Sequence, residues 1–249
     1  MHFRFDLGAF SIRVGHPPPL TVYLTRHMQS VTNVDREMHL KLADPEVPGT
    51  PLGHKQAAAG AVALADDMEK RGLLSKRFRI YRSDYLRAVE TSCHVSGELH
   101  SRMMKRGIST KLYDIRTDDR IRELEFGVLN GLGQREIATL FPDYDAYQQL
   151  LRAHHGRYYI RRFGGESPAD VGDRVRSFVG AMYRDQEKHG INTFVVVNHG
   201  LTSRVLAKIL LKQDRYWYEE QQNPQNCAIR LIVGKTDHGY IHGGVEDWD

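Results

Sequence analysis

Cysteine is scarce in this sequence. Only Cys93 and Cys227 occur among 249 residues, and no Cys-x-x-Cys pair or zinc-type spacing is present. A disulfide framework is therefore not indicated, and a reducing cytoplasmic setting is the default expectation. One bridge between the two cysteines stays open, because sequence alone does not place their Cα atoms.

Long apolar runs are also lacking. The first 20 residues carry Arg4, Asp6 and Arg13, which interrupt the apolar core that a secretion signal needs. No other stretch approaches the roughly 20 apolar residues of a membrane-spanning helix. We expect a cytoplasmic protein without a membrane partner. The length favours one large domain over two small ones, with residues 1–20 as an N-terminal extension and a single domain over 21–249.

Charge of one sign is only slightly in excess, with 35 Lys and Arg against 31 Asp and Glu, a formal net charge of +4. This mild basic bias fits a small anionic substrate such as a phosphate ester. The sequence has no long Lys/Arg run and no RNA- or DNA-reading motif, so we expect no nucleic-acid partner. The oligomeric state is not fixed by these features, and a homodimer stays open.

Short β-branched segments alternate with longer amphipathic segments along most of the chain. This alternation predicts an α/β domain: one doubly wound, mostly parallel sheet with helices on both faces. A polar, Pro-rich loop is expected at 34–52, and short helices and loops at 133–163. We expect strands at 21–25, 78–81, 110–115 and 193–197, a closing strand pair at 227–234 and 239–242, and helices at 53–70, 84–106, from Ser167 onward and at 202–211.

Basic residues and histidines directly follow three of the predicted strands. These are Arg-His at 26–27, Ser-Asp-Tyr-Leu-Arg at 83–87 and Asn-His-Gly at 198–200. In open α/β sheets, ligands bind beyond the carboxyl ends of the strands. We therefore expect two arginines and two histidines to meet at one edge of the sheet.

This set of side chains suits phosphoryl chemistry. Arginine supplies fork-shaped donors for phosphate oxygens, and a neutral imidazole is a competent nucleophile at phosphorus. A leaving alkoxide also needs a proton, for which Glu123 and Glu125 are the nearest candidates. Each feature alone is weak, since Arg-His pairs and surface glutamates are common. Their order and placement together carry the argument.

Six short motifs, taken in order, resemble those of the histidine phosphatase superfamily, which includes the cofactor-dependent phosphoglycerate mutases. Thr-Arg-His-Met-Gln-Ser…Asn resembles the family's Arg-His-Gly-Glu-Ser…Asn signature, and Ser-Asp-Tyr-Leu-Arg-Ala…Thr resembles its Ser-Pro-Leu-x-Arg-Ala-x-x-Thr segment. The resemblance covers about residues 21–235. The six motifs lie at 25–33, 51–57, 83–91, 123–127, 165–167 and 198–200.

The resemblance implies a role for each of these positions. His27 would accept the phosphoryl group. Glu123, four residues before Gly127, takes the family's acid position, and Glu125 is the less suitable candidate. The residues implied to bind the phosphate or substrate are Arg26, Ser30, Asn33, Arg87, His199 and Gly200, of which Arg26, Arg87 and His199 also belong to the catalytic set.

Three positions depart from the family pattern. Met28 and Gln29 stand where glycine and glutamate are usual, which points to a reshaped pocket floor. Leu201 replaces the asparagine of true mutases and weakens the mutase interpretation. Segments such as Arg-Phe-Gly-Gly-Glu-Ser and His-Gly-Leu-Thr-Ser-Arg-Val resemble the plant and fungal phosphoglycerate-mutase-like phosphatases.

These features favour a phosphatase that hydrolyses phosphate monoesters through phospho-His27. The first alternative is a phosphoglycerate or phosphosugar mutase that uses the same phosphohistidine. A non-catalytic phosphate-binding module is disfavoured, because every proposed catalytic position is filled.

A basic, aromatic-laced stretch precedes the Gly-Gly-Glu-Ser motif. It includes His154, His155, Arg157, Arg161 and Arg162. It is either a lid that grips the substrate beyond its phosphate, with Arg157 and Arg162 as candidate contacts, or a solvated surface loop. No cluster has the spacing of a catalytic metal site, so we expect neither a metal nor another cofactor.

Overall fold

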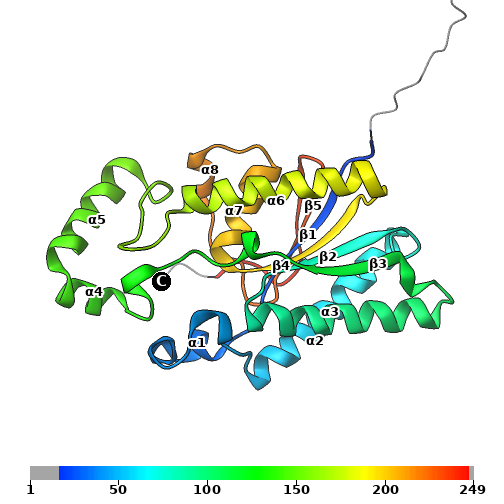
Figure 1. Cartoon of the computed structure of the whole chain (residues 1–249), viewed down its shortest axis with the longest axis horizontal. Coiled ribbons are helices and arrows are strands. Elements are labelled where there is room, and N and C mark those ends of the chain that lie inside the picture. The colour runs from blue at the N-terminus through cyan, green and yellow to red at the C-terminus, as the bar shows by residue number, and fades with distance from the viewer. Residues whose placement is uncertain (1–16, 247–249) are drawn as a thin grey trace, which may run out of the picture.

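The computed structural model of the protein describes residues 17–246, in which a six-stranded sheet lies between two layers of helices (Figure 1). The strand order is β3-β2-β4-β1-β5-β6, with β1 to β4 parallel and β5 and β6 antiparallel to their neighbours. The prediction of an α/β fold with a mostly parallel sheet is confirmed. The strands are β1 (Thr21–Arg26), β2 (Phe78–Arg82), β3 (Tyr113–Thr117), β4 (Thr193–Asn198), β5 (Ile229–Val233) and β6 (Thr236–His242).

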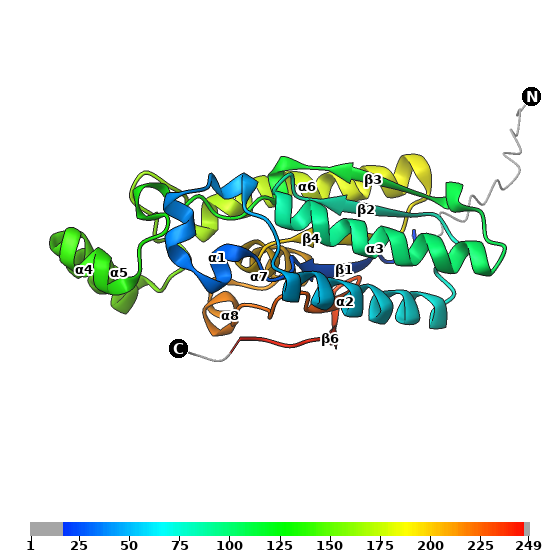
Figure 2. The ribbon, with the colours of Figure 1, turned by 90° about the horizontal axis from the view of Figure 1, so that it is seen from below.

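Long helices cover both faces of the sheet, α2 and α3 on one side and α6 and α7 on the other, while α4 and α5 extend past its end (Figures 1 and 2). Five 3-10 turns lie at 36–40, 44–46, 110–112, 119–121 and 127–129. The helices are α1 (Val31–Val34), α2 (Pro51–Lys70), α3 (Leu86–Lys105), α4 (Gln134–Leu140), α5 (Pro142–His155), α6 (Pro168–His189), α7 (Gly200–Leu210) and α8 (Arg215–Glu220).

Alternating side chains of the central strands feed two separate hydrophobic cores. On β4, Phe194 and Val196 pack with α6 and α7, whereas Val195 and Val197 pack with α2 and α3. Successive residues of a strand point to opposite faces, so a strand buried on both sides reads as a continuous apolar run. Each fully buried side chain of this size contributes about 1.5–3 kcal/mol. The central strands are thereby held firmly, and so are the loops at their carboxyl ends.

Local chemistry explains where the elements begin. The helix expected at 53 begins at Pro51, because the Thr50 hydroxyl accepts the Gly53 N–H at 2.9 Å and caps it. Ser167 caps α6 as predicted, accepting the Asp170 N–H at 3.2 Å.

Three sequence predictions of secondary structure need correction. The third strand begins at Tyr113 rather than at 110, since a 3-10 turn occupies 110–112. The segment 34–52, expected to be loop, contains two 3-10 turns. Helix α8 was not predicted.

Within residues 17–246, no helix is long and apolar enough to cross a membrane. The boundary between an N-terminal extension and the domain stays a prediction, since residues 1–16 lie outside the described part of the chain.

The first turn of α2 leaves no room for a side chain at Gly53. A Cβ there would lie 2.2 Å from the carbonyl oxygen of Gln29, two residues after His27. We expect Gly53→Ala to lower the free energy of unfolding by about 1–3 kcal/mol, because the backbone beside His27 must shift. In Gly97→Ala, the matched control on α3, the new Cβ meets nothing within 4 Å, so stability should rise by about 0.5–1 kcal/mol. Urea unfolding of both variants measures this, and equal effects would contradict the close contact.

Candidate active site

The carboxyl ends of β1, β4 and β2 bring the predicted basic residues together. Arg26 pairs in register with Asn198, so His27 and His199 follow neighbouring strands, and their ring centroids lie 5.1 Å apart. A cavity of about 750 Å³ opens above them. Of the predicted site residues, the cavity is lined by Arg26, His27, Ser30, Asn33, Arg87 and Glu123.

The His27 ring has a defined direction. Its Nδ1 lies 2.6 Å from the carbonyl oxygen of Met28. A carbonyl oxygen only accepts hydrogen bonds, so Nδ1 carries the proton and donates it there. Nε2 therefore holds an unshared electron pair, as a nucleophile requires.

Burial and positive charge keep both imidazoles neutral. Burial lowers the pKa of His27 well below its usual 6.5, and the nearby guanidinium groups of Arg87 and Arg26 lower it further. The pKa of His199 is lowered by the same causes, burial first and Arg87 next. The site thus presents neutral, rather than cationic, histidines at ordinary pH.

His199 lies beside His27 in a fully buried position and does not line the cavity. Its Nε2 lies 2.9 Å from the Ser83 hydroxyl, and its ring packs edge-on against Tyr85 at 5.0 Å. Its predicted contact with the phosphoryl group stays a prediction. The structure shows the His199 ring packed beside the His27 ring.

Two of the arginines that line the cavity are paired with carboxylates that the sequence did not single out. Arg87 Nη1 donates to the Asp44 backbone oxygen at 2.7 Å and to its carboxylate at 2.9 Å. Arg26 Nη1 forms an ion pair with Glu246. Asp44 lies in the segment expected to be loop, and Glu246 lies 220 residues from Arg26 along the chain. No local pattern marks either contact.

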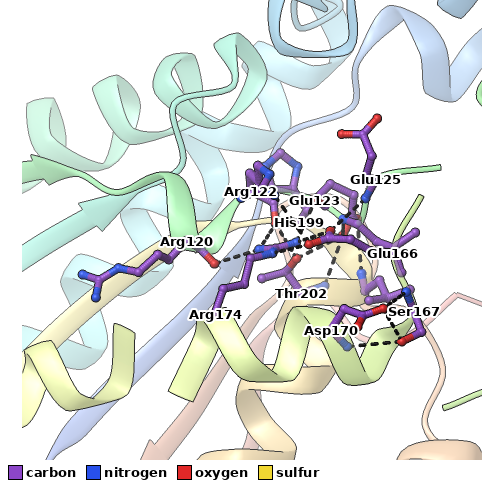
Figure 3. A network of polar contacts seen from close by, with 12 residues as sticks. Arg120, Arg122, Glu123, Glu125, Glu166, Ser167, Asp170, Arg174, His199 and Thr202 are labelled. Carbon is purple, nitrogen blue, oxygen red and sulfur yellow. Dashed lines mark hydrogen bonds and ion pairs between the residues drawn. The ribbon is translucent and has the colours of Figure 1, made fainter. Parts of the chain in front are cut away.

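Glu123 lines the cavity and is held by the start of α7 (Figure 3). Its carboxylate accepts the Leu201 N–H at 3.3 Å, the Thr202 N–H at 3.2 Å and the Thr202 hydroxyl at 3.1 Å. A helix N-terminus favours a carboxylate in this position. Glu125, in contrast, is exposed and does not line the cavity, and Figure 3 shows its carboxylate turned away.

Arg174 of α6 holds the loop that carries Glu123. Its guanidinium donates to the carbonyl oxygens of Arg120, Arg122 and Glu123 at 2.7–3.0 Å, and to both carboxylate oxygens of Glu166 at 3.0 Å (Figure 3). Bidentate arginine–carboxylate pairs fix geometry as well as adding stability. The Gly-Gly-Glu-Ser motif thereby positions the candidate acid.

The other predicted binding residues are Ser30, Asn33 and Gly200. Ser30 and Asn33 bond to each other, with Oδ1 of Asn33 accepting the Ser30 N–H at 3.0 Å. Gly200 is buried at the start of α7 and does not line the cavity.

The expected reshaping of the pocket floor by Met28 needs correction. The Met28 side chain is buried with Ala57 and Cys227, so of residues 28 and 29 only Gln29 lines the cavity.

The basic stretch before the Gly-Gly-Glu-Ser motif does not reach the His27 cavity in this structure. Arg157 and Arg162 line a separate, smaller cavity, together with Leu201. Arg161 is exposed and pairs with Asp170. Their contact with a substrate in the His27 cavity stays a prediction.

Across residues 17–246, no three His, Cys, Asp or Glu side chains gather in a group that could hold a metal ion. Activity without a metal or other cofactor stays a prediction from the sequence.

Comparison with known proteins agrees with this arrangement. The family model of the histidine phosphatase superfamily, branch 1, matches residues 22–244. The phosphoglycerate mutase-like protein AT74H of Arabidopsis thaliana is 29% identical over 86% of this chain and 74% of its own length. The broad-range acid phosphatase DET1 of Saccharomyces cerevisiae is 33% identical over 52% of this chain and 37% of its own length, so the match spans little more than a third of that protein.

Solved structures share the fold. A protein described as mycobacterial hydrolase 1 covers 91% of this chain with a TM-score of 0.67 at 20% identity. A mycobacterial glucosyl-3-phosphoglycerate phosphatase in complex with VO3 covers 85% of this chain with a TM-score of 0.61 at 23% identity. At these identities the likeness supports the fold alone.

We expect the His27 and His199 rings to stay neutral as the pH falls from about 8 to about 6, since burial and the arginines hold both pKa values below 6.5. Chemical shifts of the ring nitrogens, followed by NMR, measure the titration. A midpoint at or above 6.5 for His27 would show that the cavity does not keep its nucleophile neutral.

Proposed function

The chain belongs to branch 1 of the histidine phosphatase superfamily, and on this premise we propose that it hydrolyses phosphate monoesters through a phosphohistidine on His27. One observation carries the proposal: the Met28 carbonyl binds the Nδ1 proton of His27, which leaves Nε2 unprotonated beside two arginines in an open cavity. Such a nitrogen can attack phosphorus without first losing a proton.

In the first step, His27 Nε2 forms a bond to phosphorus as the bond from phosphorus to the ester oxygen breaks. Arg26 and Arg87 stabilise the phosphoryl oxygens, taking these in place of Glu246 and Asp44. Glu123, when protonated, gives its proton to the departing alkoxide, which leaves as an alcohol.

In the second step, water attacks the phosphorus of phospho-His27. The Glu123 carboxylate accepts a proton from that water, the bond from phosphorus to Nε2 breaks, and inorganic phosphate is released. His27 and Glu123 return to their starting states. The contacts of Glu123 with α7 hold the carboxylate in one place for both proton transfers.

The names of similar proteins support the phosphatase assignment without naming a substrate. The yeast relative is a broad-range acid phosphatase, and one solved neighbour is a glucosyl-3-phosphoglycerate phosphatase. Other relatives, such as AT74H, are described as phosphoglycerate mutase-like. The mutase therefore remains the second candidate.

The structure removes one sequence argument against the mutase, the one based on Leu201. The Leu201 side chain lines the separate arginine cavity rather than the His27 cavity, so it does not meet the bound substrate in this arrangement. The argument for hydrolysis rests instead on the cavity, which is large and lined by many polar side chains. A mutase must keep water from its phosphoenzyme.

We expect a brief reaction with a labelled phosphate ester, followed by rapid quench, to leave acid-labile label on His27. His27→Ala should lose both label and activity, since His27 is the lining imidazole on which both Arg87 and Arg26 act. His39 also lines the cavity, but the arginines that act on it are Arg87 and Arg36. Exposed His100→Ala is the matched control and should keep both. Label on another residue, or an active His27→Ala variant, would overturn the proposal.

We expect Glu123→Gln to slow hydrolysis of alkyl phosphates by about 10²–10⁴-fold, because their leaving groups need a proton. The loss should be small for nitrophenyl phosphate, whose leaving group is stable as an anion. Glu125→Gln, two residues away and exposed, is the matched control and should behave like the wild type. A larger loss in Glu125→Gln would move the acid role to that residue.

We expect phospho-His27 to transfer its phosphoryl group to water faster than back to the dephosphorylated substrate. When 3-phosphoglycerate is supplied with a trace of 2,3-bisphosphoglycerate, free phosphate should accumulate faster than 2-phosphoglycerate. Both products are measured in the same reaction. Rapid isomer formation with little free phosphate would instead establish the mutase, with the same His27 chemistry.

A further inference from the structure

A second cavity, about 120 Å³ in volume, is lined by four arginines: Arg152, Arg157, Arg162 and Arg204. It shares no lining residue with the His27 cavity. The arginines come from distant parts of the chain, namely α5, the segment between α5 and α6, and α7. A concentration of positive charge in so small a space needs a physical explanation.

Most of this charge has no acidic partner in the described part of the chain. Arg157 pairs with Glu219, with Nε 3.2 Å from the carboxylate. Within residues 17–246, no carboxylate lies within ion-pair distance of Arg152, Arg162 or Arg204. Burial lowers the pKa of Arg162 below its usual value, and the charge of Arg152 lowers it further. Crowding like charges in a partly buried space is unfavourable unless an anion joins them.

The tyrosine of the cavity does not supply that anion. Burial raises the pKa of Tyr218 to about 12, so its hydroxyl stays neutral even beside Arg204 and Arg157. The Arg204 guanidinium lies 4.7 Å from the Tyr218 ring centroid. Its Nη1 donates to the Gln221 carbonyl at 2.9 Å, whereas its Nε is buried without a hydrogen-bond partner. A buried donor without an acceptor is costly.

We propose that this cavity is a second anion site, which binds one phosphate-type oxyanion apart from the reacting phosphoryl group. Arg152, Arg162 and Arg204 supply the charge, and their planar guanidinium groups match the oxygens of a phosphate. Its volume of about 120 Å³ leaves room for a single phosphate group among the guanidinium groups.

The site borders the His27 cavity through two residues. Phe126 lines the His27 cavity, and the Arg162 guanidinium lies 5.6 Å from its ring centroid. Leu201 lines the arginine cavity, while its N–H donates to Glu123. The bound oxyanion is therefore either free phosphate or a second phosphate group on a ligand that extends past this wall.

The test is the number of labelled inorganic phosphates bound at equilibrium, measured by dialysis. Wild type should bind two. Arg87→Met, altered in the His27 cavity, should keep the second site, and Arg162→Met/Arg204→Met should keep only the His27-cavity site, with affinity at the other lowered by about tenfold or more. One phosphate bound by wild type and still bound by the double variant, or two bound by the double variant with unchanged affinity, would overturn the proposal.

Fold damage is controlled in two ways. Removing mutually repelling charges should leave the Tm of the double variant in phosphate-free buffer unchanged or higher. Arg152→Met, an exposed position on α5, should weaken the second site without touching the core. Normal phosphate binding in Arg152→Met and in Arg162→Met alone would also refute the site. Phosphate counting needs no turnover, so its result is independent of whether His27 is phosphorylated.

A second arm identifies the source of the anion. Hexyl phosphate carries one phosphate and hexane-1,6-diol bisphosphate carries two. If KM rises in Arg162→Met/Arg204→Met for the bisphosphate alone, the site holds the second phosphate of one ligand. If both KM values stay unchanged while phosphate binding is lost, the site takes free phosphate. Each result supports the site, and unchanged KM values with unchanged phosphate binding refute it.

Discussion

A hydrogen bond of 2.6 Å, from Nδ1 of His27 to the carbonyl of the next residue, sets the direction of the imidazole on which the proposed chemistry depends. The surrounding backbone keeps this carbonyl in place. The His27 N–H donates to Asn198 of β4, and the Met28 N–H donates to the Thr91 hydroxyl of α3, both at 2.9 Å. Thr91 in turn donates to the carbonyl of Arg87. The proposed nucleophile is thus held by the sheet and by α3, the helix that also carries Arg87.

The candidate acid is held by the opposite layer of the molecule. Glu123 bonds to the start of α7, and its loop is bound through Arg174 of α6. The His27 side of the cavity is tied to α3 and the Glu123 side to α6 and α7, so the two halves of the reaction meet across the sheet edge. Relative movement of the layers would change the distance between nucleophile and acid without breaking either anchor.

The sequence predicts the centre of the site better than its periphery. His27, Arg26 and Arg87 follow buried parallel strands, and the ends of such strands must meet. This geometry follows from periodicity alone. The side chains beyond those ends depend on contacts between distant residues. Hydrophobic periodicity does not predict such contacts. Examples are the pairing of Arg26 with Glu246, the burial of the Met28 side chain, and the place of Arg162 in a cavity separate from that of His27. Element boundaries differ by a few residues for a similar reason, since caps such as Thr50 decide them.

The pairing of Arg87 with Asp44 and of Arg26 with Glu246 has a consequence for selectivity. At these two arginines an incoming ester would replace counterions that the protein itself provides. Its affinity is the difference between two sets of pairings, and a monoanion with a single carboxylate gains little from such an exchange. A dianion with three oxygens on one phosphorus gains at both arginines. If the proposed function holds, this exchange of ion pairs at Arg26 and Arg87 would favour a phosphate monoester over a monoanion before any contact with the leaving group is made.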